Sequence, residues 1–299
     1  MALIINGKEL AKELESGLAQ KVNELIVKTS QRPRLAVVLV GSDPASKIYV
    51  GLKTKRANLC GIEVADFCYP ENISTSELKI ELERIVKGQN GNQIPDGILI
   101  QLPLPKQIVV DEVLSVIPVE LDVDGLVPLS QGLMLRGQTR FEPCTPLGIL
   151  KLIDKANELL GNSILLRGKK AVVLGRSLIV GKPIGLMLLE KDCTVTFCHS
   201  KTQNLKEECR QADILIVAIG VANFITSEYV KTGAIVIDVG INRLADGRVV
   251  GDVDFEQVSQ VAAALTPVPG GVGPMTIAML LQNVVKSAIG RTVCGAIYK

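Results

Sequence analysis

Residues 170–185 read Lys170-Ala-Val-Val-Leu-Gly175-Arg-Ser-Leu-Ile-Val-Gly181-Lys-Pro183-Ile-Gly185, and they decide the fold of the second half of the chain. The apolar run without polar alternation is typical of a strand that is covered on both faces. Glycines follow it, and Pro183 suits the first turn of a helix, where its missing N–H is not needed. The stretch therefore predicts a strand, a turn and a helix, a unit that can hold a pyrophosphate at the helix N-terminus. Because the spacing is not Gly-x-Gly-x-x-Gly, it also fits a tight turn in any α/β protein.

Similar apolar runs recur on both sides of this stretch, separated by helical patterns. They predict strands at residues 35–40, 62–68 and 97–100 in the first half, and at 170–174, 194–198, 214–219 and 234–239 in the second. A first helix is expected at about residues 8–27. Strands that alternate with helices imply right-handed crossovers and mostly parallel sheets. The sequence thus predicts an α/β fold.

The length of 299 residues is comfortable for two domains. A stretch dense in Pro, Gly and Asp lies between Pro118 and Pro146, and a helix is expected after it, to about Leu160. We therefore predict one domain at residues 1–143 and a second at 144–275. Pattern alone leaves open which domain the last helix, which starts near Thr276, packs against.

Composition narrows the classes of partner. The net charge is +2, from 33 basic and 31 acidic residues, and only 3% of residues are aromatic. This balance provides no basic surface for nucleic acid or for an anionic membrane. The seven cysteines form no Cys-x-x-Cys pair and His199 is the single histidine, so no metal site is expected. Free thiols, a short apolar start and no apolar window of about 18 residues predict a soluble, cytoplasmic protein.

The segment that follows the strand at 194–198 bears on the choice of dinucleotide. Sites that prefer NAD usually carry Asp or Glu about 20 residues past the glycine loop, where it bonds the ribose 2′-OH. Here the segment reads His199-Ser200-Lys201-Thr202 and contains no acid. Together with Arg176 from the loop, these groups suit a 2′-phosphate, so we expect NADP. His199 lies at the adenosine end, where a capping or phosphate-side contact is favoured over acid–base work.

In the first half, Tyr49 and Lys53 are four residues apart on an expected helix and therefore share a face. A phenol beside an amine is a usable acid–base pair if burial lowers the pKa of the lysine. The same spacing fits an amphipathic helix with a solvated lysine. It also marks short-chain dehydrogenases, but there the pair follows the glycine loop, whereas Tyr49 precedes Gly175 by more than a hundred residues.

Three further segments suit a small, flat, polar ligand. Gln101 follows an expected strand, at the edge where open α/β sheets bind ligands. Asp122 and Asp124 could accept hydrogen bonds from an aminopyrimidinone edge, although an ordinary Asp-Gly turn explains them as well. The loop at residues 267–276 is rich in glycine and lets backbone approach a ring, but it could also be a connection that caps a helix.

Taken together, these segments resemble the bifunctional methylenetetrahydrofolate dehydrogenase/methenyltetrahydrofolate cyclohydrolase family. The matching motifs run in the expected order along the chain: Tyr49-Val-Gly-Leu-Lys53, Gln101-Leu-Pro-Leu-Pro105, Asp122-Val-Asp124-Gly125, Pro143-Cys-Thr-Pro146, Gly175-Arg-Ser177 with Val180-Gly-Lys-Pro183, Val236-Ile-Asp-Val-Gly-Ile241-Asn242, and Pro267 to Thr276. The resemblance implies NADP-dependent oxidation of 5,10-methylenetetrahydrofolate to the methenyl cation, followed by hydrolysis to 10-formyltetrahydrofolate. Leu178 and Ile179 depart from the family, which often has a polar residue first.

The resemblance also implies roles for single residues. Lys53 would be the acid–base residue of the hydrolysis, and Gln101 would hydrogen-bond it and favour its neutral form. Tyr49 would orient Lys53 and stack on the folate, and Asp124, rather than Asp122, would anchor the pterin. The expected NADP contacts are Gly175, Arg176, Ser177, Ser200 and Ile241. The expected lining of the folate pocket, besides Tyr49, Gln101 and Asp124, is Gly271, Gly273 and Thr276.

The family fold implied by the resemblance is an N-terminal α/β catalytic domain and a C-terminal Rossmann-like NADP-binding domain, with a homodimer through the latter. It also implies that the final helix, residues 276–292, packs back on the first domain. Two alternatives stay open: a dehydrogenase without cyclohydrolase activity, and a non-enzymatic NADP-sensing module.

Overall fold

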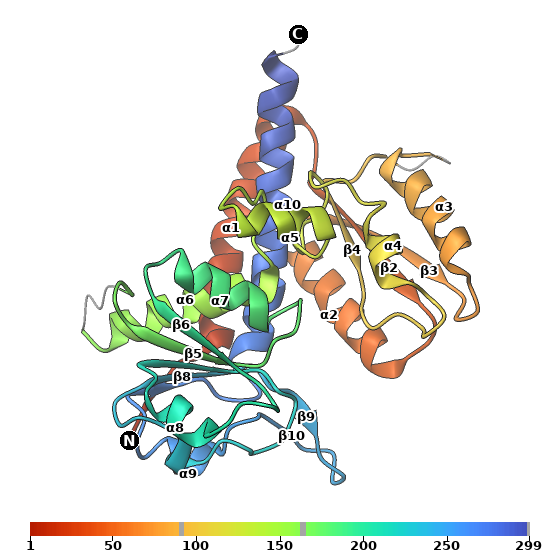
Figure 1. The fold of residues 1–299 in the computed structure, drawn as a ribbon. Coiled ribbons are helices and arrows are strands. Elements are labelled where there is room, and N and C mark those ends of the chain that lie inside the picture. The colour runs from red at the N-terminus through yellow and green to blue at the C-terminus, as the bar shows by residue number, and fades with distance from the viewer. Residues whose placement is uncertain (90–92, 162–165, 298–299) are drawn as a thin grey trace. The chain divides into compact units, whose positions relative to one another are not determined.

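The computed structural model describes residues 1–89, 93–161 and 166–297, with side chains up to Arg291. The chain forms two compact units (Figure 1). Unit 1 comprises residues 1–11 and 143–276, and unit 2 comprises residues 12–142 and 277–299. Two helices belong partly to each unit, namely α1 (Gly7–Thr29) and α10 (Val272–Ile297).

Unit 1 is built on a parallel sheet with the strand order β1-β11-β8-β7-β5-β6. Its strands are β1 (Leu3–Ile4), β5 (Lys170–Leu174), β6 (Thr194–Cys198), β7 (Ile214–Val217), β8 (Ile235–Asp238) and β11 (Ala264–Leu265). Figure 1 shows α6 (Cys144–Leu159) and α7 (Gly181–Leu189) on one face, with α8 (Leu205–Arg210) and α9 (Phe255–Val258) on the other. The short η1 (Ser227–Tyr229) and the antiparallel pair β9 (Asn242–Arg243) and β10 (Val249–Val250) complete it. The predicted α/β class with parallel sheets is confirmed.

The start of the chain differs from the predicted domain boundaries, which placed residues 1–143 together. Leu3 pairs with Ala264, so β1 is an edge strand of the unit 1 sheet. The backbone N–H of Ile5 donates to the carbonyl of Leu265 at 2.9 Å. A Cβ added to Gly7 would lie 1.9 Å from the carbonyl oxygen of Gly271, so the chain after β1 is packed backbone to backbone. A strand of two residues carries no readable period, and the sequence pattern therefore missed it.

Unit 2 is built on the parallel sheet β3-β2-β4, formed by β2 (Arg34–Val40), β3 (Glu63–Tyr69) and β4 (Gly97–Ile100). Right-handed crossovers place α2 (Pro44–Leu59) and α3 (Thr75–Val86) on opposite faces, because the chain leaves β2 toward one side and returns past it to β4. With α4 (Val110–Leu114), α3 covers one face. The buried core there includes Ala36, Val38, Leu78, Leu82, Ile98, Ile100 and Val113. The helix α5 (Pro128–Leu135) follows later in the unit.

From Ile277 onward, α10 lies in unit 2. The side-chain amide of Asn283 donates to the carbonyls of Val123 and Glu142, at 2.9 and 3.0 Å. The expectation that no window of about 18 residues is apolar enough to cross a membrane is wrong for residues 272–291, which pass by length and composition, and 67% of that window is buried inside the protein. Its apolar character is therefore what packing against its own chain requires.

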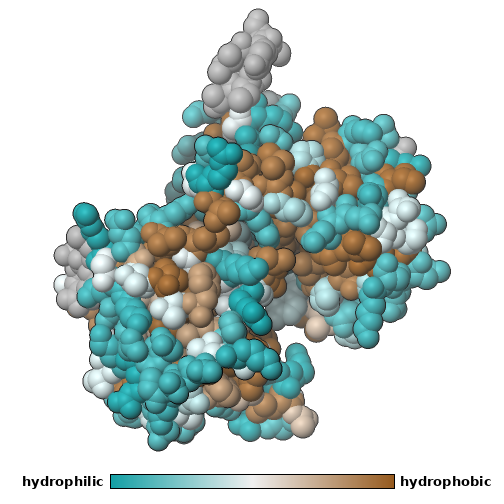
Figure 2. Space-filling model, in the orientation of Figure 1, coloured by the Kyte–Doolittle hydropathy of each residue, from teal (hydrophilic) through white to brown (hydrophobic). Residues whose placement is uncertain are grey.

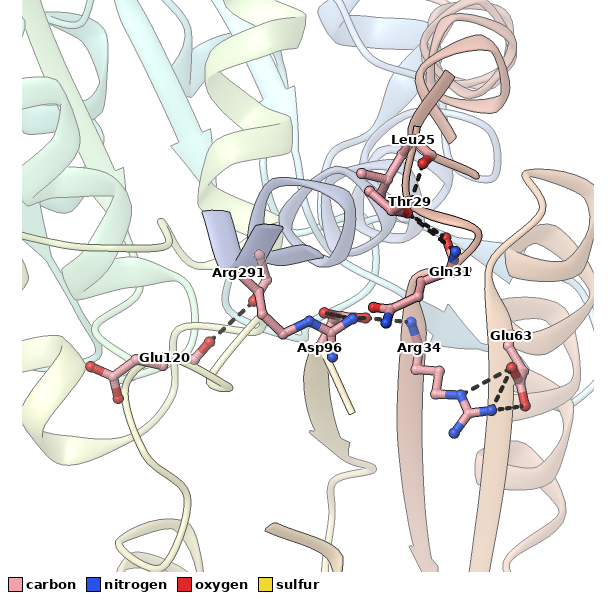
Figure 3. A network of polar contacts seen from close by, with 9 residues as sticks. Leu25, Thr29, Gln31, Arg34, Glu63, Asp96, Glu120 and Arg291 are labelled. Atoms are coloured by element: carbon pink, nitrogen blue, oxygen red, sulfur yellow. Dashed lines mark hydrogen bonds and ion pairs between the residues drawn. The ribbon is translucent and has the colours of Figure 1, made fainter. Parts of the chain in front are cut away.

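Asp96, which precedes β4, joins α10 to the start of the sheet of unit 2 (Figure 3). Its carboxylate is 1% exposed, accepts the backbone N–H of Arg34 at 2.8 Å, and lies 3.0 Å from the guanidinium of Arg291. Arg34 in turn contacts both oxygens of Glu63. Burial raises the pKa of Asp96, whereas the charge of Arg291 opposes that rise.

Candidate active site

The first cluster lies in unit 2, where α2 approaches the end of β4. Asp43 caps α2 by accepting the backbone N–H of Ser46 at 2.7 Å, and Pro44 occupies the first turn. Lys53, three turns into this helix, is half-buried, and its Nζ donates to Oε1 of Gln101 at 2.9 Å. The two residues that the sequence predicted to work together are therefore in direct contact.

The amide of Gln101 is held in one orientation. Its Nε2 donates to the carbonyl of Leu102 at 2.7 Å, so Oε1 is left to face the amine. Its backbone N–H donates to the carbonyl of Val38 at 2.9 Å, which fixes the residue at the carboxyl end of the sheet. The amide oxygen of Gln101 carries no formal charge, so Gln101 positions Lys53 without placing a second charge beside the amine.

Beside Lys53, α2 presents an exposed apolar face. Ile48, Tyr49 and Leu52 are 60%, 39% and 45% exposed. Because residues three and four apart are neighbours on a helix, Tyr49 and Lys53 share one side of it. An aromatic ring next to an amine can cover a flat ligand while the amine reaches its polar edge.

The two acids of the predicted pterin site differ in environment. Asp122 is 3% exposed, and its oxygens accept the backbone N–H groups of Leu126 and Val127 at 3.1 and 2.9 Å. Burial raises the pKa of Asp122, and these hydrogen bonds oppose the rise. Asp122 thus shapes the turn, while Asp124 stays half exposed. This difference supports the choice of Asp124 for a ligand contact.

The second cluster lies in unit 1 at the carboxyl edge of its sheet, beginning with the loop after β5. Gly175 has φ +125°, and a Cβ on it would lie 2.2 Å from the carbonyl oxygen of Ala218. A Cβ on Gly181 would lie 2.4 Å from the carbonyl oxygen of Gly175. The loop therefore folds on itself so closely that positions 175 and 181 have no room for a side chain. Backbone that is free of side chains at these positions can form a cradle for phosphates.

Ser177 closes this loop with its hydroxyl. Its Oγ accepts the backbone N–H groups of Val180 and Gly181, both at 3.2 Å. A hydroxyl that accepts with its lone pairs still carries one hydrogen to donate. Ser177 is exposed, as is Arg176 before it, so both can reach a ligand at the start of α7.

The turn after β6 is organised by the single histidine. The backbone N–H of His199 donates to Oγ1 of Thr202 at 2.8 Å, and Nδ1 of His199 accepts the backbone N–H of Lys201 at 3.1 Å. The histidine therefore stabilises the turn at residues 199–202. Ser200 stays exposed at the tip of this turn.

The loop after β8 carries Ile241, which is 53% exposed. Beneath it lie two buried acids that sequence reasoning did not single out, Asp238 and Asp252, 3% and 0% exposed. Asp238 falls inside a predicted strand and Asp252 beside a glycine, and neither pattern marks a functional acid. Their burial could have drawn attention to them, but burial is a property of the fold.

The loop at residues 267–276 belongs to unit 1, as do Gly271, Gly273 and Thr276. Gly271 is buried, and a Cβ on it would lie 2.6 Å from the carbonyl oxygen of Pro267. The Thr276 hydroxyl lies 3.0 Å from that of Thr145. Internal packing thus accounts for Gly271, and Gly273 and Thr276 remain the more open positions of the predicted folate lining.

A cavity of about 150 Å³ in unit 2 lies away from this chemistry, at the opposite end of the strands. It is lined by the ion-paired Arg34 and Glu63 among others. Within the described ranges, no group of three or more His, Cys, Asp or Glu residues is placed to hold a metal ion. None of the described cysteines forms a disulfide.

Two family models match this chain in succession. The catalytic domain of tetrahydrofolate dehydrogenase/cyclohydrolase matches residues 5–124, and the NAD(P)-binding domain of the same family matches residues 143–292. The chain is 50% identical over 290 residues to the bifunctional protein FolD of Oceanobacillus iheyensis, covering 97% of this chain and 98% of the relative.

Solved structures agree with these matches. The bifunctional enzyme FolD, methylenetetrahydrofolate dehydrogenase/cyclohydrolase, from Campylobacter jejuni is 46% identical with a TM-score of 0.91, covering 97% of this chain and all of that one. The corresponding enzyme of Trypanosoma brucei, solved with NADP cofactor and an inhibitor, is 34% identical with a TM-score of 0.90 and 98% coverage of both chains. This chain belongs to the tetrahydrofolate dehydrogenase/cyclohydrolase family.

Proposed function

We propose that this chain catalyses two consecutive reactions of one-carbon folate metabolism. The first oxidises 5,10-methylenetetrahydrofolate to 5,10-methenyltetrahydrofolate with NADP⁺, and the second hydrolyses that cation to 10-formyltetrahydrofolate. The observation that carries the proposal is the Lys53 amine, held 2.9 Å from the Gln101 amide oxygen beside the exposed ring of Tyr49.

The hydrolysis gives Lys53 a defined task. Water forms a C–O bond to the methenyl carbon, the bond from that carbon to N5 breaks, and one proton is released overall. A neutral Lys53 can take the proton from the attacking water and return one to N5 as it leaves. General acid–base catalysis of this kind contributes about 10²–10⁴ in rate.

The folate would be held by the groups around the amine. Tyr49 would stack on its ring system, while the half-exposed carboxylate of Asp124 would accept hydrogen bonds from the pterin edge. In unit 1, Gly273 and Thr276, the more open positions of the loop at residues 267–276, would also contact the folate, whereas the buried Gly271 serves the packing of that loop. Asp122 serves the fold of the turn instead, because its oxygens are engaged by backbone N–H groups.

Unit 1 fits a dinucleotide. The loop has no room for a side chain at Gly175, so its backbone can approach a phosphate, and Ser177 keeps a hydroxyl hydrogen to donate. Arg176 and Ser200 are exposed at the ends of β5 and β6 and would hold the 2′-phosphate, while Ile241 would offer backbone to the nicotinamide. When bound, NADP⁺ supplies the acceptor for the hydride.

A Lys53→Met variant tests the acid–base role. We expect its hydrolysis of methenyltetrahydrofolate, followed by the loss of methenyl absorbance, to fall by about 10²–10⁴. Lys55→Met is the matched control, since Lys55 is exposed on the same helix. Retained hydrolysis in the Lys53 variant would overturn the assignment.

The parent itself separates the two alternative functions. A parent that forms NADPH but does not hydrolyse methenyltetrahydrofolate would be a dehydrogenase alone, and one that binds NADP without turnover would be a sensing module.

The nucleotide preference is tested by Arg176→Ala, with exposed Arg210→Ala as the control. Losing a charge-assisted contact to the phosphate should raise the KM for NADP by about tenfold or more and leave that for NAD nearly unchanged. An Arg176 variant that binds NADP as tightly as the parent would contradict the 2′-phosphate assignment.

We also infer a homodimer through unit 1. Figure 2 shows apolar side chains over α6 and α7, with polar ones over α8. Leu189 at the end of α7 and Phe197 on the edge strand β6 are 58% and 41% exposed. An open strand edge beside an apolar helix is a surface that a second copy can cover. Sedimentation of the parent and of Phe197→Glu tests this.

For the location of the protein in the cell we infer the cytoplasm, where a fluorescent fusion should be found.

A further inference from the structure

Two buried carboxylates in unit 1 have no task in the chemistry above. Asp238 ends β8, and Asp252 follows β10, and neither is more than 3% exposed. Each accepts N–H groups, and among the described residues neither carboxylate forms an ion pair with a Lys, Arg or His side chain. Holding two acids together in this way is costly unless the contacts they make are needed.

Asp252 joins the loops that follow two neighbouring strands. Its Oδ2 accepts the backbone N–H groups of Ile219 and Gly220, after β7, at 2.7 and 2.9 Å. Its Oδ1 accepts the side-chain amide of Asn242, after β8, at 2.8 Å. One side chain thus fixes the distance between both loops.

Asp238 holds Asp252 in place from the strand side. Its Oδ1 accepts the backbone N–H groups of Gly240 and Asp252 at 2.9 and 3.0 Å, and its Oδ2 accepts that of Val253 at 3.0 Å. A Cβ on Gly251 would lie 1.8 Å from Oδ2 of Asp238, and one on Gly240 would lie 2.2 Å from Oδ1 of Asp252. The backbone has closed around both carboxylates.

The place of these loops in the sheet gives them their meaning. A dinucleotide crosses the carboxyl edge of a doubly wound sheet, with its pyrophosphate at the glycine loop. The strand order β8-β7-β5-β6 puts the adenosine half over β6 and the nicotinamide half over β7 and β8. The loops that Asp252 joins are therefore those beneath the nicotinamide.

We propose that Asp252, held by Asp238, is a positioning residue that sets the backbone at residues 219–220 and 240–242 to receive the nicotinamide half of the dinucleotide. This inference rests on the proposed function, because it needs a dinucleotide across this edge. It requires no contact between either carboxylate and the nucleotide.

Three variants grade the perturbation. Asp252→Ala removes the side-chain contacts to Ile219, Gly220 and Asn242. Asp252→Asn is the conservative variant. Its amide oxygen can still accept from Ile219 and Gly220, and its amide nitrogen can donate to the side-chain oxygen of Asn242 once the Asn242 amide has flipped. Asn242→Ala frees only the loop after β8. Val258→Ala, fully buried on α9, is the control that weakens unit 1 without touching these loops.

The experiment compares two ligands, NADP and 2′,5′-ADP, the latter lacking the nicotinamide. We expect Asp252→Ala to weaken NADP binding by about tenfold or more, Asn242→Ala by less, and Asp252→Asn least. Two other quantities should stay within about twofold of the parent: the affinity for 2′,5′-ADP and the rate of methenyltetrahydrofolate hydrolysis, a reaction with water that uses no dinucleotide.

An equal loss of both ligands, or a lower Tm with unchanged NADP binding, would overturn the inference and leave the acids a structural role. If Asp252→Ala does not fold, Asn242→Ala decides, and unchanged NADP binding there has the same meaning. A parent that binds neither ligand would instead contradict the proposed function.

Discussion

At the scale of single residues, the neutral oxygen of Gln101 beside Lys53 predicts how the pH profile of hydrolysis responds to a charge. Gln101→Glu would put a carboxylate in that place and favour the ammonium form of the lysine. We expect hydrolysis near pH 7 to slow and its rising limb to move to higher pH by about 1–3 units. Gln107→Glu, an exposed change in the same unit, is the control. An unmoved profile would show that Gln101 does not govern the amine.

The buried acids make the stability of unit 1 depend on pH. Burial raises the pKa of Asp238 to about 7, with Asp252 acting in the same direction and backbone N–H groups opposing it. In the unfolded chain the group keeps a pKa of about 3.9. Between these values the folded state holds a proton that the unfolded state has released. The contribution of Asp238 to the free energy of unfolding is therefore fully present below about pH 4 and is lost as the pH rises to about 7.

Asp238→Asn cannot titrate, so its free energy of unfolding should fall less than that of the parent between pH 5 and pH 7.5. Urea denaturation at both pH values measures the difference. Equal changes in parent and variant would mean that Asp238 is ionised throughout this range.

At the scale of elements, α10 is tied to the sheet of unit 2 through Arg291 and Asp96 (Figure 3). Arg291→Ala would leave a nearly fully buried carboxylate without its cation. Since the guanidinium is itself 44% exposed, we expect a loss of about 1–3 kcal/mol in the free energy of unfolding, measured with urea. Lys286→Ala, an exposed change on the same helix, should cost below about 1 kcal/mol. A larger effect at Lys286 would contradict this view of the helix.

How far sequence predicts an element depends on its length. The strands of four to seven residues, β2 to β8, all lie where continuous apolar runs predicted them. The two-residue strands β1, β9, β10 and β11 escaped, because two residues show no period. Local order in sequence also suffices for Tyr49 and Lys53, which share a helix. Asp252 could not be found in that way, since its partners at 219, 220 and 242 are brought to it only by the folded sheet.

At the scale of the whole molecule, a ligand that binds the folded state but not the unfolded state raises the free energy of unfolding by mass action. NADP at about 100 times its Kd should add about 2.7 kcal/mol and raise the Tm, whereas the same concentration of NAD should add less. Arg176→Ala should bring the NADP shift down to that of NAD. Thermal scans at fixed protein concentration measure these shifts, and equal shifts by both dinucleotides in the parent would contradict the preference.

The pairing of β1 with β11 also bears on how the protein is made. Leu3 leaves the ribosome early, but its partner Ala264 is synthesised about 260 residues later, a wait of about 10–50 s at ordinary rates of translation. Unit 2 waits as well, because it includes residues from 277 onward. Neither unit can be completed before residues 264–265 and the segment from residue 277 onward have been synthesised, so the two units finish folding nearly together.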